Sequence, residues 1–226
     1  MAVEAVIFDL DGTLAQFNLD FKAMRSEIRS YLISMHIPIS ILDVNESIFE
    51  TLKKVEIYVK NKIKSNEAFE ELRIKVLAIA EKYEMQAAAS TNLLSGAVET
   101  LKELQQMRLK LGLCTTSSET AANFILQRFK IENYFKVVVP RDKVKYVKPH
   151  TEQFQLALKT LGIHAKDSLI VGDSIVDMQS AKELKAIAVG LPTGLSSTNQ
   201  LMGNGANYII TSLTDLPTLV KEIDKP

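Results

Sequence analysis

The chain has 226 residues and a mass of 25.2 kDa, which is enough for one large domain or one domain with a modest insertion. Lys plus Arg and Asp plus Glu number 27 each, so net charge gives no reason to expect nucleic acid or an anionic membrane as a partner. The single cysteine, Cys114, excludes an internal disulfide, and three scattered histidines leave no plausible zinc cluster.

The first residues, MAVEAVIFDLDGTL, carry acids at Glu4, Asp9 and Asp11. A secretory signal would instead have a basic region followed by an uninterrupted apolar core. No apolar run approaches the roughly 20 residues needed to cross a bilayer. We therefore expect a soluble, cytoplasmic protein, with its oligomeric state left open between monomer and homodimer.

The first predicted element is a buried strand at residues 3–10, VEAVIFDL, which is β-branched and bounded by Asp-Gly. Residues 16–91 then show three helical stripes of apolar side chains in place of strand-like runs. The stripes run over residues 21–35, 48–59 and 69–83, with breaks at Pro38 and Ser65-Asn66. Helices that each bury one stripe would form a bundle, so the sequence predicts an all-helical cap domain at residues 16–91.

From residue 92 onward, strand-like and helical patterns alternate. The predicted strands are residues 109–114, 136–139, 168–171, 187–190 and 208–210, and the predicted helices are 97–107, 119–129, 151–161, 178–184 and 215–223. This alternation predicts an α/β core domain, residues 1–15 and 92–226, built on a Rossmann-like, doubly wound parallel sheet. Cys114 falls within a predicted strand, where we expect a buried, unreactive thiol.

Two acids stand at the end of the first predicted strand, Asp9 and Asp11 in the sequence DLDGT. Residues two apart in a strand point the same way, so both carboxylates could face one pocket. An ordinary strand-to-turn transition would use the same residue types, because Asp and Gly are common in turns.

Hydroxyl groups follow the next predicted strand, which ends in Thr115, Thr116 and Ser117. Their hydroxyls and backbone amides begin a helix and could hold an anion, although a helix cap alone would explain them.

A lysine and two further acids complete the set. Lys148 lies in a loop before Pro149, and the strand at residues 168–171 runs into Asp173 and Asp177. Lys148 could be a solvated surface residue, and Asp173 could only cap a helix. All of these groups, however, fall at or just beyond the carboxyl ends of predicted parallel strands, where ligands bind in open α/β sheets. We therefore predict that they form one functional site.

The set resembles the four motifs of the haloacid dehalogenase (HAD) superfamily, in the same order. The matching segments are FDLDGTL at 8–14, Thr115, Lys148-Pro149 and GDSIVD at 172–177. The resemblance spans nearly the whole chain outside the cap. A helical insertion after the first motif is similar to the phosphoglycolate phosphatase and β-phosphoglucomutase branch. The resemblance implies a magnesium-dependent phosphatase acting on a small phosphorylated metabolite, phosphoglycolate-like or a sugar phosphate. A nucleotide and pyrophosphate also remain open as substrates. One departure is that a glycine usual after the last motif's helix is replaced around Lys185.

The same resemblance implies a role for each motif residue. Asp9 attacks phosphorus and forms an aspartyl-phosphate intermediate. Asp11 protonates the leaving group and later deprotonates the attacking water. Lys148 holds Asp9 and a phosphoryl oxygen, while the Thr115 hydroxyl donates to another oxygen.

The implied cofactor is Mg²⁺, which prefers oxygen ligands. Its implied ligands are Asp9, the backbone carbonyl of Asp11, and Asp173, with Asp177 orienting a ligand or a bound water. The implied substrate-binding residues are Gly12, Thr13 and Thr116.

Other functions remain as alternatives. A phosphomutase would keep all of these residues and differ only in how the cap retains a bisphosphate intermediate. A dehalogenase of the same fold needs neither the acid at Asp11 nor a metal. A receiver-like signalling domain has its acidic pair and its phospho-accepting Asp in a different order. A non-catalytic binding protein would have lost the nucleophile or a metal ligand, and none is missing.

The substrate-recognising residues are harder to predict. Lys22, Arg25 and Arg29 recur on one face of the first cap helix and could hold a substrate carboxylate or a second phosphate. Solvated charges are the more usual explanation for such a pattern.

Overall fold

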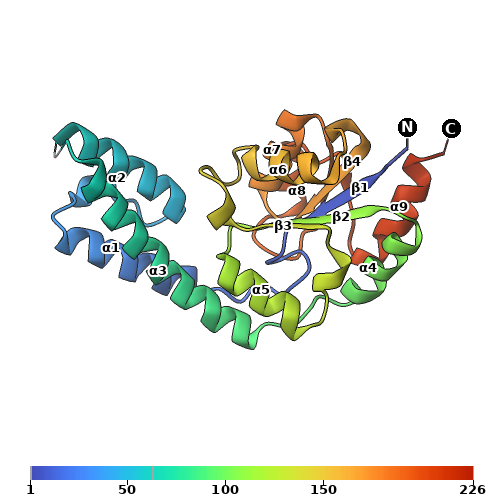
Figure 1. The fold of residues 1–226 in the computed structure, drawn as a ribbon, viewed down its shortest axis with the longest axis horizontal. Coiled ribbons are helices and arrows are strands. Elements are labelled where there is room, and N and C mark those ends of the chain that lie inside the picture. The colour runs from blue at the N-terminus through green and yellow to red at the C-terminus, as the bar shows by residue number, and fades with distance from the viewer. Residues whose placement is uncertain (1, 63, 226) are drawn as a thin grey trace. The chain divides into compact units, whose positions relative to one another are not determined.

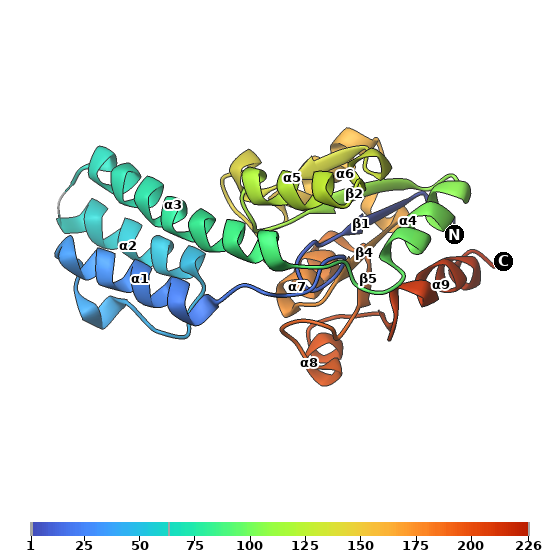
Figure 2. The ribbon, with the colours of Figure 1, turned by 90° about the horizontal axis from the view of Figure 1, so that it is seen from below.

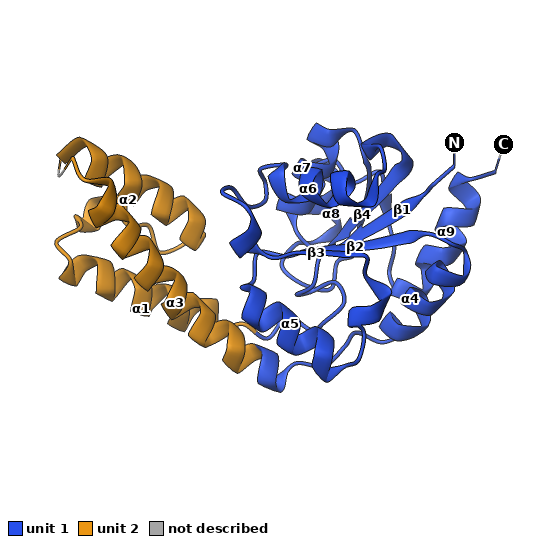
Figure 3. Ribbon diagram, in the orientation of Figure 1, with its two compact units in different colours: residues 1–18, 88–226 blue, residues 19–87 orange. Residues whose placement is uncertain are grey.

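The computed structural model describes residues 2–62 and 64–225. The chain divides into two compact units, residues 1–18 with 88–226 and residues 19–87 (Figure 3). The sequence pattern placed the divisions at 15/16 and 91/92. The second division lies earlier in the structure because the last residues of the long helix α3, Asn66–Ser90, already belong to the first unit.

The first unit is built on a six-stranded parallel sheet in the order β3-β2-β1-β4-β5-β6. The strands are β1 Ala5–Phe8, β2 Lys110–Cys114, β3 Val137–Val139, β4 Ser168–Gly172, β5 Ile187–Gly190 and β6 Tyr208–Ile209. All six predicted strands are present, and the predicted Rossmann-like α/β fold is confirmed. The first strand of the chain is central, so that Phe8 pairs with Leu113 on one side and Val171 on the other.

Helices cover both faces of the sheet (Figures 1 and 2). Val6 and Phe8 of β1 point into one hydrophobic core, and Ala5 and Ile7 point into the other. This division follows from the alternation of side chains along a strand. The helices on the Val6 face are α4 Ala97–Gln106, α5 Glu119–Arg128 and α9 Leu216–Ile223; those on the Ala5 face are α6 Glu152–Leu161, α7 Ile175–Leu184 and α8 Thr198–Gly203.

Among the helices of the first unit, α7 and α8 differ most from the prediction. Helix α7 begins at Ile175 and not at residue 178, because Ser174 and Asp177 form a capping box that starts the helix earlier. Helix α8 was not predicted from the pattern of apolar residues, although Ser197 and Gln200 form a second capping box at its start. Lys185 ends α7 with φ 59°, the left-handed conformation that glycine adopts without a steric cost.

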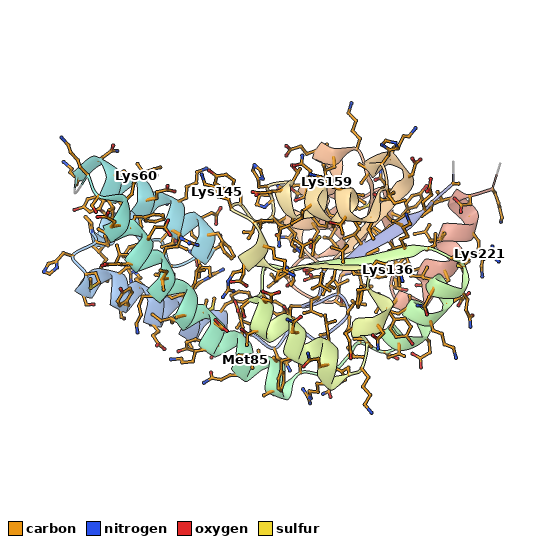
Figure 4. The ribbon with its side chains drawn as sticks, in the orientation of Figure 1. Lys60, Met85, Lys136, Lys145, Lys159 and Lys221 are labelled. Carbon is orange, nitrogen blue, oxygen red and sulfur yellow. The ribbon has the colours of Figure 1, made fainter. Side chains whose placement is uncertain are left out.

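On the Val6 face, α4 and α9 lie side by side. Lys221 of α9 is labelled in Figure 4. Its Nζ lies 2.9 Å from Glu103 Oε1 of α4, in an exposed ion pair. An exposed pair of this kind adds little to stability, so the apolar contacts beneath it hold the two helices together.

The second unit consists of α1 Phe21–Ser34, α2 Ile48–Lys62 and most of α3. The predicted stripes form its core, which includes Met24, Ile28, Leu32, Val55, Val59, Phe69 and Val76. Met35, at the end of the first predicted stripe, is exposed because α1 ends at Ser34. Within the described residues, no helix of either unit combines the length and apolar composition needed to span a bilayer.

Candidate active site

The candidate site lies where three neighbouring strands end. Asp9 follows β1, Thr115 follows β2, and Asp173 follows β4. Because β1 pairs in parallel with both β2 and β4, these three residues emerge at the same edge of the sheet. Lys148 reaches this edge from the loop before α6, and Asp177 from the first turn of α7.

Lys148 is the centre of the site's hydrogen bonding. Its Nζ lies 2.7 Å from Asp9 Oδ1 and 2.7 Å from Asp177 Oδ1, and it donates to the Cys114 carbonyl at 3.1 Å. These three bonds match the three hydrogens of an ammonium group. The side chain is buried, so the ion pairs are shielded from water. The contact with Asp9 is the one that the family resemblance implies, whereas no pattern in the sequence indicated the pair with Asp177.

Asp177 has partners on both oxygens. Oδ1 accepts from Lys148, while Oδ2 accepts from the hydroxyl and backbone N–H of Ser174 at 2.5 and 3.3 Å. The carboxylate therefore has a fixed orientation, which suits a residue that holds Lys148 in place.

The charges of the site are unequal. Burial raises the pKa of Asp9 well above its usual range, the charges of Asp177 and Asp173 raise it further, and Lys148 opposes them. Burial, with the charge of Asp177, also raises the pKa of Asp173 to about 6. For Lys148, burial acts to lower the pKa, but Asp177 and Asp9 outweigh it and the pKa is raised. One ammonium thus faces three carboxylates, an environment that attracts a further cation.

The three carboxylates also lie close enough to share that cation. Asp9, Asp173 and Asp177 each offer one oxygen, and these oxygens all lie within 4.8 Å of one another. A buried set of oxygen donors suits a hard divalent ion such as Mg²⁺. The structure therefore brings together three of the four residues predicted at the metal.

The fourth, Asp11, directs its carboxylate elsewhere. Its Oδ2 accepts a hydrogen bond from Ser117 Oγ at 2.6 Å. This arrangement is compatible with the sequence prediction, which assigned only the backbone carbonyl of Asp11 to the metal.

Three predicted substrate-side residues occupy turns around the cluster. Thr115 is buried, and its Oγ1 accepts from the Ser117 N–H at 3.1 Å. Thr116 accepts at its carbonyl from Arg141 Nη1 at 3.3 Å. Thr13 donates from Oγ1 to Asp173 Oδ1 at 3.4 Å, so its hydroxyl supports a predicted metal ligand in addition to lying near the predicted substrate site.

A family model described as haloacid dehalogenase-like hydrolase matches residues 6–190 of the chain. The chain belongs to this family. The match includes all four motifs that the sequence analysis identified, at residues 8–14, 115, 148–149 and 172–177.

Similar proteins indicate which kind of hydrolase this is. The pyrophosphatase PpaX of Oceanobacillus iheyensis is 26% identical over 230 residues, covering 97% of this chain and 98% of the relative. A hydrolase from Pseudomonas syringae has 30% identity and a TM-score of 0.73, covering 98% of this chain and 100% of that one. A predicted phosphoglycolate phosphatase from Haemophilus somnus, with 19% identity and a TM-score of 0.67, shares the fold over 96% of this chain and 97% of its own. The protein is a HAD-type phosphatase.

In this HAD protein, the backbone at two glycines passes so close to Asp173 that a side chain would not fit. A Cβ at Gly12, where φ is +85°, would lie 2.5 Å from Asp173 Oδ2, and one at Gly194 would lie 1.9 Å from the same atom. The backbone N–H of Leu195 donates to Asp173 Oδ2 at 2.9 Å. Asp173 is therefore enclosed by the loop after β5. The sequence analysis did not identify Gly194 and Leu195. Their position after the parallel strand β5 was a signal, because the loops that follow parallel strands lie at the same edge of the sheet as the site.

Gln153 was also missed, and it links two predicted phosphate-binding residues. Its Nε2 donates to the Thr115 carbonyl at 2.7 Å and to the Val139 carbonyl at 3.1 Å. Its Oε1 accepts from the Lys148 N–H at 3.2 Å, and the whole side chain is buried. The only signal in the sequence is an amide on the apolar face of a helix.

We expect Gln153→Leu to destabilise the protein by about 2–3 kcal/mol, because it leaves buried backbone groups without their partner. It should also lower kcat by about tenfold, since Thr115 and Lys148 lose a common support. Urea unfolding and steady-state turnover measure the two effects. Gln155→Leu, on the exposed side of the same helix, is the matched control, and an equal loss in both variants would contradict the assignment.

Cys114 lies buried in β2, as the sequence predicted. Burial raises the pKa of its thiol, and Sγ lies 3.5 Å from the Gln153 carbonyl. A thiol held protonated in this way is a poor nucleophile.

Proposed function

We propose that this HAD phosphatase is Mg²⁺-dependent and transfers a phosphoryl group from a small metabolite first to Asp9 and then to water. The observation that carries the proposal is the position of Asp9. It stands at the end of the central strand, bonded to Lys148 and beside the carboxylates of Asp173 and Asp177. A carboxylate, an ammonium group and a set of oxygen donors thus lie together, which supports the proposal because phosphoryl transfer needs a nucleophile and positive charge at one place.

In the first step, an oxygen of Asp9 forms a bond to phosphorus as the bond to the leaving oxygen breaks. Asp11 gives its proton to that oxygen. The Thr115 hydroxyl donates to a phosphoryl oxygen, and the Lys148 ammonium beside Asp9 offsets the charge of the phosphoryl group. Bound Mg²⁺, held by Asp9, Asp173 and the Asp11 carbonyl, would neutralise further charge on the phosphoryl group.

In the second step, water attacks the phosphorus of the aspartyl phosphate. The water gives a proton to Asp11, and the bond between phosphorus and Asp9 breaks, which releases phosphate and restores both carboxyl groups. The two steps together consume one water for each phosphate released.

We also propose that residues 19–87 are the cap, the part that excludes water and contacts the organic portion of the substrate. Arg25 and Arg29 line a small cleft within this unit together with Asp43 and Glu46. Arg25 Nη1 donates to the Asn45 carbonyl at 3.2 Å. The acids balance the two arginines, which supports a structural role for them over a grip on the substrate.

Pyrophosphate is a second candidate substrate, which the relatives named pyrophosphatase favour. Phosphate release should be measured from pyrophosphate, phosphoglycolate, glucose 6-phosphate and a nucleotide, each with Mg²⁺ and with EDTA. We expect release that depends on Mg²⁺, and the preferred compound identifies the substrate class. Interconversion of sugar phosphates without release would favour a mutase, and inactivity on every compound would refute the proposal.

Mg²⁺ should stabilise the protein more at pH 7.5 than at pH 5. The raised pKa of Asp173, about 6, means that the folded protein binds more protons than the unfolded chain between pH 4 and 6. Without metal, this acid therefore costs stability as pH rises through that window. At pH 7.5 Mg²⁺ replaces the lost proton, and we expect a Tm increase of about 5 °C against at most about 1 °C at pH 5. Differential scanning calorimetry measures both, and equal increases would contradict the cluster as the metal site.

A further inference from the structure

The hydroxyl of Ser117 makes a short contact with the proposed proton donor. Ser117 Oγ donates to Asp11 Oδ2 at 2.6 Å, although the residues are 106 positions apart. Ser117 is buried, and its backbone is held on both sides. Its N–H donates to Thr115 Oγ1 at 3.1 Å, and its carbonyl accepts from the Arg141 N–H at 3.2 Å.

We propose that Ser117 is the positioning residue for Asp11, an inference that rests on the proposed function. A carboxyl group can rotate about its last bond, and proton transfer needs one of its oxygens within hydrogen-bond reach of the leaving oxygen. A bond from Ser117 to Oδ2 fixes that rotation and therefore where the other oxygen points. The acid is thus held by the turn that follows β2.

Helix capping does not account for Ser117. The residue that caps α5 is Ser118, whose Oγ accepts from the Ala121 N–H at 3.2 Å. The Ser117 side chain turns instead toward the loop after β1. The sequence grouped Ser117 with Thr115 and Thr116 as a possible anion donor, whereas the structure gives its hydroxyl a carboxylate as partner.

The contacts of Ser117 also make its substitution selective. Its bonds to Thr115 and from Arg141 use backbone atoms, so Ser117→Ala keeps both and loses only the contact with Asp11. Thr115 continues to accept from the same N–H, and its own hydrogen remains a donor for the phosphoryl group.

The test compares two leaving groups. An alkoxide must be protonated as it leaves, whereas p-nitrophenolate leaves readily without a proton. We expect Ser117→Ala to lower kcat/KM about 30-fold for an alkyl ester such as phosphoglycolate, and less than about threefold for p-nitrophenyl phosphate. The ratio kcat/KM is the right quantity because it reports the steps up to departure of the leaving group. Ser117→Thr, which keeps the hydroxyl, should have a kcat/KM for the alkyl ester close to that of the wild type.

Ser118→Ala is the matched control, because it removes the neighbouring hydroxyl and a helix cap while leaving Asp11 its partner. Any loss it causes should be the same for both esters. Equal losses for both esters in Ser117→Ala would overturn the inference and leave the proposed function intact. Wild-type protein that releases no phosphate in Mg²⁺ from these two esters or from any other compound of the substrate panel, pyrophosphate included, would overturn the proposed function, and the inference with it.

Discussion

Asp9→Asn is expected to abolish phosphate release, with kcat lowered at least about 10⁴-fold, because an amide oxygen does not form the covalent intermediate. The folded protein should survive the change. Burial, the largest influence on Asp9, disfavours its charge, and removing that charge relieves repulsion from Asp177 and Asp173. We therefore expect the metal-free variant to unfold at the same temperature as the wild type or higher.

Phosphate release and calorimetry on the same preparation separate chemistry from stability. Asp142→Asn, which changes an exposed acid outside the cluster, should keep wild-type turnover. Acid quenching of the wild type during turnover of a ³²P-labelled ester should trap label on the protein, and Asp9→Asn should trap none. Substantial turnover by the Asp9 variant would show that another group is the nucleophile.

Lys148→Met should have the second largest effect, and it should act on stability as well as on rate. Removing the partner of buried carboxylates leaves their charge uncompensated, at a cost of about 3–5 kcal/mol. We expect kcat to fall about 10³-fold as well, since Lys148 contacts Asp9 and would contact the phosphoryl group.

The loss of stability in Lys148→Met should depend on pH. In the wild type, the raised pKa of Lys148 means that its ion pairs contribute fully at any pH below the usual lysine value of 10.5. Without the lysine, the charge of Asp9, whose pKa burial already raises, is neutralised only by proton binding, which low pH favours. Urea unfolding should therefore show a smaller difference from wild type at pH 5 than at pH 8. Lys143→Met, which breaks only the exposed pair with Glu119, is the control, and equal stability of the two variants would contradict the account.

The sequence was most informative where the signal is local. Each strand of the sheet is a short apolar run, and each helix of the second unit carries its own stripe, so both could be predicted without knowing what packs against them. The motif residues could be placed at one edge because a parallel sheet brings strand ends together. The capping box of α8, formed by Ser197 and Gln200, is also a local signal. It was overlooked because the helix of six residues that it begins is too short to show an apolar pattern.

The contacts that the sequence did not reveal join side chains that are distant along the chain. Asp177 meets Lys148 because α7 and the loop before α6 face the same strand ends. Gln153 meets Thr115, and Ser117 meets Asp11, through loop conformations that no periodic pattern encodes. Raised pKa values belong to the same class, since they arise from burial and from the sum of several charges.

The central place of β1 also has a consequence for biosynthesis. The strand that precedes the proposed nucleophile is made first, yet its partners are β2, at residues 110–114, and β4, at residues 168–172. During translation, more than 100 further residues are synthesised after the apolar segment Ala5–Phe8 before its first partner strand emerges. Until then the segment has no strand to pair with. The helices of residues 19–87 make local contacts and can form in the interval. The edge of the sheet that holds the proposed active site is therefore assembled late, and an incomplete chain that ends before β4 has neither Asp173 nor Asp177 to complete it.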